Sequence, residues 1–272
     1  MAPSDGTGEL RVGRSEIARM ARAAETVRDC RRRLSGGGIL GEVTAGTAIC
    51  HDWRRYPDGE VYDPASHAQY FYHQHPAVER AAGEHGHFHA FLRAEGMPPG
   101  VSPLVLPEIG VADPARPPQA APARRGGRDE ISHLVAVVLD HRGEPVRLFT
   151  TNRWVTGETW YPAADVIRML DRFTFAEMTP APLTSCWLSA LIQLFRPQVA
   201  ALLQTRDETV MAWRRRRRGN VFEDPRLEIT SAIEIDLDAQ LAFVAQTSSG
   251  AAPRGRSRLP NLAEGWGEDR AD

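Results

Sequence analysis

Histidines in two short segments are the residues whose type and spacing could do chemistry. Six of the nine histidines lie between positions 67 and 89. Stretches 69–75 and 85–91 alternate in polarity and are rich in aromatic residues, which is typical of β-strands. Successive side chains of a strand point to opposite faces, so histidines two positions apart share a face. Five histidines follow this spacing: His73, His75, His85, His87 and His89.

Pairing of the two strands would bring these imidazoles together. An antiparallel register with a residue sum near 160 places His73 opposite His87 and His75 opposite His85, with facing Cβ atoms about 4.5–5.5 Å apart. His133 opens the next predicted strand and could supply a further ligand. Neutral imidazole nitrogens bind zinc, iron or copper, and three protein ligands leave a position open for water or substrate. The sequence predicts a divalent-metal site drawn from His73, His75, His85, His87, His89 and His133.

The alternative is a set of half-buried histidines that only form hydrogen bonds across the sheet. Five imidazoles on one face would repel one another when protonated and would leave nitrogens unpaired, which favours the metal. The prediction depends on the register, because a slip of one residue would scatter the cluster. Ligands must be neutral, so binding is expected to weaken as the pH falls through about 6.5.

Acidic and polar residues near these strands are further candidates. Glu79 and Glu84 could orient an imidazole, although Glu84 faces away from the histidines unless a bulge at Gly86 re-aims it. Asn152 and Arg153 follow a predicted strand and could bind the carboxylate or phosphate of a cofactor. The alternative for this pair is local bonding between side chains and backbone.

The elements that must position these residues follow from periodicity. Helices are expected at about 16–34, 162–173, 183–195 with a restart at Pro197, and 238–245, and strands also at 133–140, 146–151 and 227–235. The segment Tyr56-Pro57-Asp58-Gly59 is typical of a turn. Strands do not alternate with helices, so the predicted fold class is α+β, an antiparallel sheet covered by helices on one side.

Proline and glycine mark the predicted domain limits. Residues 97–122 contain eight prolines, which deny the backbone donors that helices and interior strands require. We expect one α+β domain over 14–246, with a proline-rich, disordered insertion at 96–129 and disordered tails at 1–13 and 247–272.

Composition excludes several chemistries. The 272 residues are 42% apolar and 25% charged with a net charge of −2, so no general attraction to nucleic acid or anionic membrane is expected. All 33 basic residues are arginine, which excludes Schiff-base and P-loop lysines. Three scattered cysteines and the absence of a signal peptide or a long apolar run predict a cytoplasmic protein.

Three motifs carry a family resemblance. Together they are similar to a bacterial family described only as a domain of unknown function, over about residues 16 to 245. The resemblance implies a single domain with the proline-rich stretch inserted in it, and implies no activity, cofactor or catalytic residue. The motifs are Tyr56-Pro57-x-Gly59-x-Val61-Tyr62-Asp63, Glu84-His85-Gly86-His87-Phe88-His89, and Leu148-Phe149-Thr150-Thr151-Asn152-Arg153-Trp154-Val155-Thr156-Gly157-Glu158-Thr159-Trp160.

The sequence thus predicts a metal-binding protein acting on a small molecule or serving a protein partner. A catalytic role would be hydrolytic with zinc, or oxidative with iron or copper. The alternative is a non-enzymatic interaction or regulatory module with structural histidines, which would use its arginine-rich helices and the proline-rich stretch.

Overall fold

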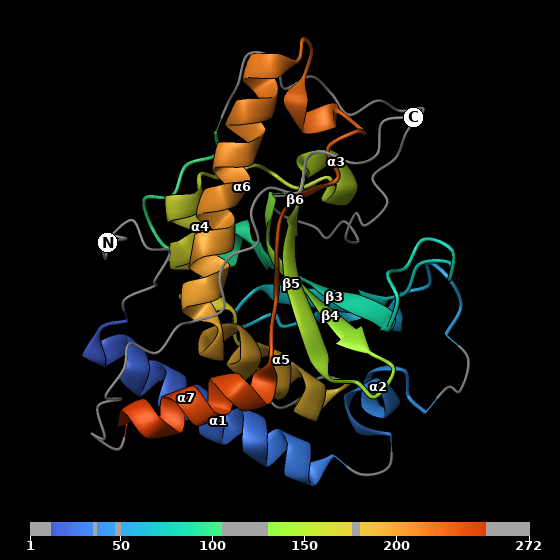
Figure 1. The fold of residues 1–272 in the computed structure, drawn as a ribbon, viewed down its shortest axis with the longest axis vertical. Helices are drawn as coiled ribbons and strands as arrows, with labels where there is room; N and C mark the ends of the chain where they lie inside the picture. Colours follow the sequence, from blue (N-terminus) through green and yellow to red (C-terminus); the bar gives the residue numbers. More distant parts are fainter. Residues whose placement is uncertain (1–11, 35–36, 47–49, 105–129, 176–179, 249–272) are drawn as a thin grey trace.

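A six-stranded antiparallel sheet runs through the computed structural model, with the strands in chain order (Figure 1). The structure describes residues 12–34, 37–46, 50–104, 130–175 and 180–248. The predicted α+β class is confirmed. The strands are β1 Tyr56–Tyr62, β2 Ala68–His73, β3 Glu84–Arg93, β4 Ile131–Asp140, β5 Pro145–Thr151 and β6 Ile229–Glu234.

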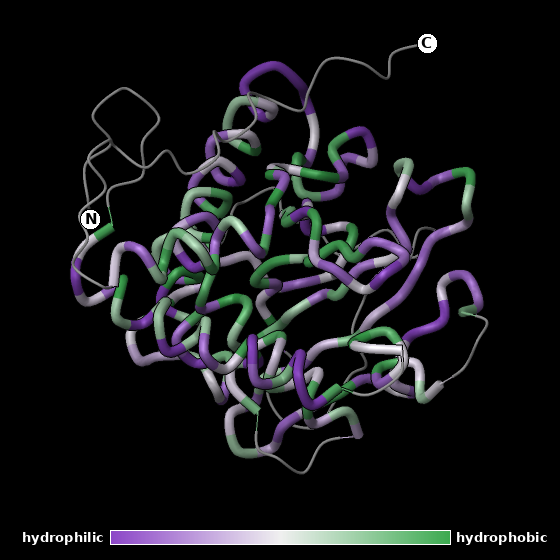
Figure 2. Tube along the Cα trace, turned by 60° about the horizontal axis from the view of Figure 1, so that its bottom comes forward, coloured by the Kyte–Doolittle hydropathy of each residue, from purple (hydrophilic) through white to green (hydrophobic). Residues whose placement is uncertain are grey.

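Helices pack mainly on one face of this sheet, as expected. They are α1 Arg14–Arg33, α2 Gly38–Val43, α4 Ala163–Met169, α5 Pro182–Leu194, α6 Arg196–Arg216 and α7 Leu237–Ser248. Hydrophobic and hydrophilic stretches alternate along them (Figure 2), because each turns one side to the core. Their buried side chains meet Tyr70, Phe88 and Val137 from the sheet in one large cluster.

The opposite face is covered differently. Phe71, Phe91 and Ile131 pack there with Trp154 and Val155 from α3 Arg153–Thr156. A second small cluster, built around Ala136, Val138, Phe149 and Ala232, lies on the same side. This face also carries the histidines, so they lie away from the main helical core.

The burial of strand β4 shows that both faces of the sheet are covered. Nine of its ten residues are buried, and its sequence is apolar at successive positions instead of alternating, which is typical of a strand covered on both sides. The residues that face the histidines from β4 are therefore also sequestered from solvent.

Two segments differ from the sequence expectations. The segment predicted as a turn at Tyr56–Gly59 lies within β1, whose register shifts between Tyr56 and Val61. Of the predicted insertion, residues 97–104 contact α4 and the segment before it: Leu104 N–H donates to the Trp160 carbonyl (2.8 Å), and Arg168 donates to the Pro99 carbonyl (2.7 Å).

The remaining parts of the predicted insertion and tails, at 105–129, 1–11 and 249–272, lie outside the described residues. The single-domain organisation stays a prediction. Among the described residues no single helix is long and apolar enough to cross a membrane; α5 and α6 reach that length and composition only as a pair bent by 72°.

Candidate metal centre

Three imidazoles from two neighbouring strands converge on one point. His73 ends β2, and His87 and His89 lie on β3, with His73 directly opposite His87 and Phe71 opposite His89. The Nε2 atoms of His73 and His87 are 2.9 Å apart, and those of His87 and His89 are 3.1 Å apart. One ring nitrogen from each of the three lies within 4.8 Å of the others, so this group could hold a metal ion.

The contacts among the Nε2 atoms fit a cation better than protons. A neutral imidazole nitrogen either donates through its N–H or accepts through its lone pair, never both. The Nε2 of His87 contacts two other Nε2 atoms. Its single proton or single lone pair would therefore have to serve both contacts. Nitrogens bound to one tetrahedral zinc at its usual distance are about 3.3 Å apart, close to the observed spacing.

Burial keeps these imidazoles neutral. His73 and His89 are 1% exposed, and removal from water lowers the pKa of His73 to about 3. Burial also holds the pKa values of His87 and His89 well below the ordinary value, and neighbouring imidazoles add to the effect. The lone pairs needed for coordination are thus available at neutral pH.

His133 lies behind His89 and not beside the other Nε2 atoms. The Nδ1 of His89 is 3.1 Å from the Nε2 of His133, and the Nδ1 of His133 is 3.4 Å from Thr151 Oγ1. In the tautomer that leaves Nε2 of His89 free to coordinate, its Nδ1–H donates to His133. This is the arrangement by which outer residues orient a metal-binding histidine.

Glu158 was not singled out from the sequence. It is 1% exposed, and its Oε2 accepts the backbone N–H of His133 at 2.7 Å. Burial raises the pKa of Glu158 to about 7, against the opposing charge of Arg206 and the bond from His133. A single glutamate in a polar motif gives no sign of burial, so only the fold identifies it.

A cavity of about 100 Å³ opens beside the imidazoles. It is lined by His73, His87 and His89 together with charged residues from the surrounding segments: Glu79, Arg80, Glu84, Arg147 and Glu228. The site therefore has a side from which a small molecule could approach.

Contrary to the sequence prediction, His75 and His85 do not face each other across the two strands. His75 lies just beyond the end of β2, with its ring centroid 5.1 Å from those of His73 and His87 and 4.2 Å from that of Trp53. It lines the cavity but is outside the group of three. His85 points to the helical face, where its Nδ1 is 2.5 Å from the Tyr72 hydroxyl.

A bulge causes this separation. The register of β3 against β4 shifts between Glu84 and Gly86, which reverses the facing of the two residues before Gly86. His85 therefore leaves the predicted cluster, which is a correction of the sequence interpretation. Glu84 turns to the histidine face, where its carboxylate pairs with Arg147 at 2.6 Å.

Asn152 and Arg153 are engaged within the chain. The Asn152 side chain accepts from the Arg153 N–H at 2.9 Å and donates to the Val221 carbonyl at 2.8 Å. The Arg153 guanidinium pairs with Glu223. These contacts correspond to the local-bonding alternative, and neither residue lines the cavity beside the histidines. Their cofactor-binding role stays a prediction.

Comparison with known proteins gives a family. The family model described as Domain of unknown function (DUF6969) matches residues 21–235. No curated protein and no solved structure matches the chain.

Proposed function

The chain belongs to the DUF6969 family, a domain of unknown function, and from its histidine site we propose that it is a metal-binding protein in which His73, His87 and His89 hold one divalent ion. The observation that carries the proposal is the convergence of three neutral ring nitrogens within 4.8 Å, from the buried His73 and His89 and the half-buried His87. His75 and His133 are assigned to the surroundings of this ion.

Zinc is the metal that the donor set favours. Three neutral imidazoles with an open fourth position are a known catalytic zinc arrangement, whereas the common iron site replaces one imidazole with a carboxylate. Iron and copper also accept imidazole nitrogens and remain the competing metals. Zinc would supply Lewis acidity for a hydrolytic reaction, and iron or copper would supply oxidative chemistry.

The cavity supports a small-molecule substrate as the partner. Its volume of about 100 Å³ suits a molecule of a few heavy atoms and not a polymer chain.

The three free cysteines are ordinary for a reducing compartment, so we also propose a cytoplasmic, bacterial protein.

Metal analysis after dialysis tests the proposal. We expect about one zinc per chain in the parent and a loss of stoichiometric metal in the double variant His87→Ala, His89→Ala. The matched control is His85→Ala, which removes an imidazole from the same strand but from the other face. It should retain the metal. Competition with iron(II) and copper(II) salts identifies the preferred ion.

The competing function is an interaction module with structural histidines. Aromatic contacts favour it: the ring of His87 lies 5.2 Å from that of Phe149, and that of His89 lies 5.4 Å from that of Phe71. Such packing would hold the imidazoles without an ion. A parent protein that binds no stoichiometric metal and melts at the same temperature with and without chelator would establish this alternative.

A further inference from the structure

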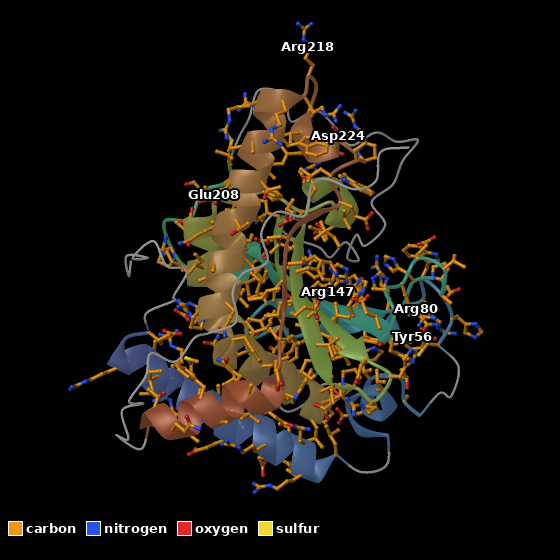
Figure 3. All side chains as sticks on the ribbon, viewed as in Figure 1. Tyr56, Arg80, Arg147, Glu208, Arg218 and Asp224 are labelled. Atoms are coloured by element: carbon orange, nitrogen blue, oxygen red, sulfur yellow. The ribbon has the colours of Figure 1, made fainter. Side chains whose placement is uncertain are left out.

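Two arginines that line the cavity beside the histidines each have an Nε–H group that no side-chain or backbone atom of the described residues accepts from. Arg147 is 9% exposed, and Arg80 is half-buried. The Nε atom of each is buried without a hydrogen-bond partner. Figure 3 shows Arg147 over the strands and Arg80 on the segment before β3. A buried N–H group left unpaired is unfavourable. Both side chains line the cavity, so a ligand acceptor there could pair with them once the guanidinium turns toward it.

The rest of each guanidinium is fixed in place. Arg147 donates to Glu84 at 2.6 Å and lies 5.5 Å from the centre of the Phe149 ring. Arg80 donates to the His85 carbonyl at 2.9 Å. These contacts hold both guanidinium groups at the cavity before any ligand arrives.

The charges that line the cavity indicate the charge of a ligand that would suit it. The cavity is lined by two arginines and three glutamates, which together carry one negative charge. The histidines are neutral ligands and contribute none. A divalent ion would change the total to one positive charge, which a singly charged anion would balance.

We propose that the cavity binds a small carboxylate, with one carboxylate oxygen toward the ion held by His73, His87 and His89 and the other accepting from Arg147. This inference rests on the proposed metal site and deepens it by assigning a substrate class. A planar carboxylate matches the geometry of a guanidinium N–H group, and Arg80 adds a second donor at the same cavity.

The test uses the full chain loaded with cobalt(II), whose visible absorption changes when an anion binds the ion. Acetate is the probe, and inorganic phosphate is the competing anion. We expect a saturable change with acetate in the parent. Removal of the Arg147 donor should raise the acetate dissociation constant at least about tenfold.

The principal variant is Arg147→Gln combined with Glu84→Gln. Replacing both partners removes the donor without leaving an unpaired buried glutamate, and the net charge of the cavity is unchanged. Arg147→Lys is the second variant, since it retains the charge and the pair with Glu84 but lacks the Nε–H group. The matched control is Arg142→Gln, an arginine of the same hairpin that pairs with Asp140 (3.0 Å) and does not line this cavity.

The outcomes separate the two proposals. Weaker acetate binding in both Arg147 variants, with one cobalt per chain retained and the control unchanged, supports the carboxylate site. Equal acetate affinity in the parent and in both variants overturns it while leaving the metal site intact. Tighter binding of phosphate than of acetate overturns the carboxylate assignment. A parent that retains no stoichiometric cobalt overturns the metal site and this inference with it.

Discussion

The Nε2 atoms of His73 and His87 lie 2.9 Å apart at directly opposed positions of β2 and β3, although 14 residues separate them in the chain. This contact depends on the β2–β3 register and on the close approach of the two backbones next to it. It connects the stability of the sheet with the geometry of the site.

Gly86→Ala should damage both the fold and the site. A Cβ at Gly86 would lie 2.5 Å from the His73 carbonyl oxygen and 2.6 Å from the Tyr72 hydroxyl, so β2 would have to move at one of the proposed ligands. We expect a loss of about 1–3 kcal/mol in the free energy of unfolding, together with weaker metal binding. Denaturant titration and metal analysis measure the two effects. Gly13→Ala, where an added methyl meets nothing within 4 Å, is the control. It should leave metal binding unchanged and cost at most about 1 kcal/mol, because Gly13 is the N-cap of α1.

His133→Phe should weaken the metal without removing a ligand. The variant deletes the acceptor for Nδ1–H of His89 while leaving the proposed ligand set of three. Loss of such an outer partner costs about 10–100-fold in metal affinity. Competition with a chromophoric chelator gives the affinity. His133→Gln, which restores an acceptor, should lie between the parent and His133→Phe. Equal affinities in all three proteins would contradict the orienting role.

The metal-free protein should lose stability in acid. Burial lowers the pKa values of His73 and His133 to about 3, whereas the unfolded chain takes up protons at about 6.5. The unfolded state therefore binds more protons below pH 6.5, and the free energy of unfolding falls as the pH decreases. Each such imidazole should contribute roughly 1 kcal/mol of loss by pH 5.5. Unfolding of chelated protein between pH 7.5 and 5 measures the slope, which should be shallower in His133→Phe.

The same depressed pKa values change the expectation for metal release. A proton competes with the ion in the folded protein only near the folded pKa. Metal loss should therefore begin well below pH 6.5 and should coincide with acid unfolding. Equilibrium dialysis against buffers of decreasing pH, with circular dichroism on the same samples, tests the coincidence. Release from fully folded protein at pH 6.5 would contradict it.

Glu158→Gln should act at the other end of the pH range. Burial raises the pKa of Glu158 to about 7, so the folded protein retains a carboxyl proton that the unfolded chain loses above about 4.5. Stability is therefore lost as the pH rises from about 4.5 to about 7, by an amount on the order of 3 kcal/mol. Glutamine retains the acceptor for the His133 N–H and does not ionise. Relative to the parent, the variant should gain stability between pH 5 and pH 8. Identical pH profiles would show that Glu158 does not titrate in this window.

Periodicity predicted the sheet because its strands are adjacent in the chain. The residue sum of 160 that pairs His73 with His87 is confirmed, since the short connection between β2 and β3 allows few other registers. Parity alone could not place His85, because one extra residue at the Glu84–Gly86 bulge reverses the facing of its neighbours. Glu84, named as a residue that such a bulge would re-aim, is brought to the histidine face.

The features that the sequence did not predict depend on packing between residues far apart in the chain. The pKa of Glu158 is raised by burial and lowered by the charge of Arg206, nearly 50 residues later in the chain. The turn expected at Tyr56–Gly59 follows from local preferences: Tyr56 pairs with β2, and the residues after it form the irregularity in β1 before pairing resumes at Val61, with Gly59 at a positive φ of 80°. Local patterns therefore identified the strands that carry the histidines, whereas the surroundings of the site required the fold.

Strand order in the sheet has a consequence for how the protein could acquire its ion during synthesis. All three proposed ligands lie in the single hairpin β2–β3, whereas His89 and His133 are 44 residues apart. The entropy cost of closing a loop rises with its length, so the proposed ligands would come together in the hairpin before β4, β5 and β6 have left the ribosome. On that route the proposed metal would be an early nucleus on which later strands are added in order of translation. Starvation for the ion would then reduce the yield of folded chains as well as their occupancy.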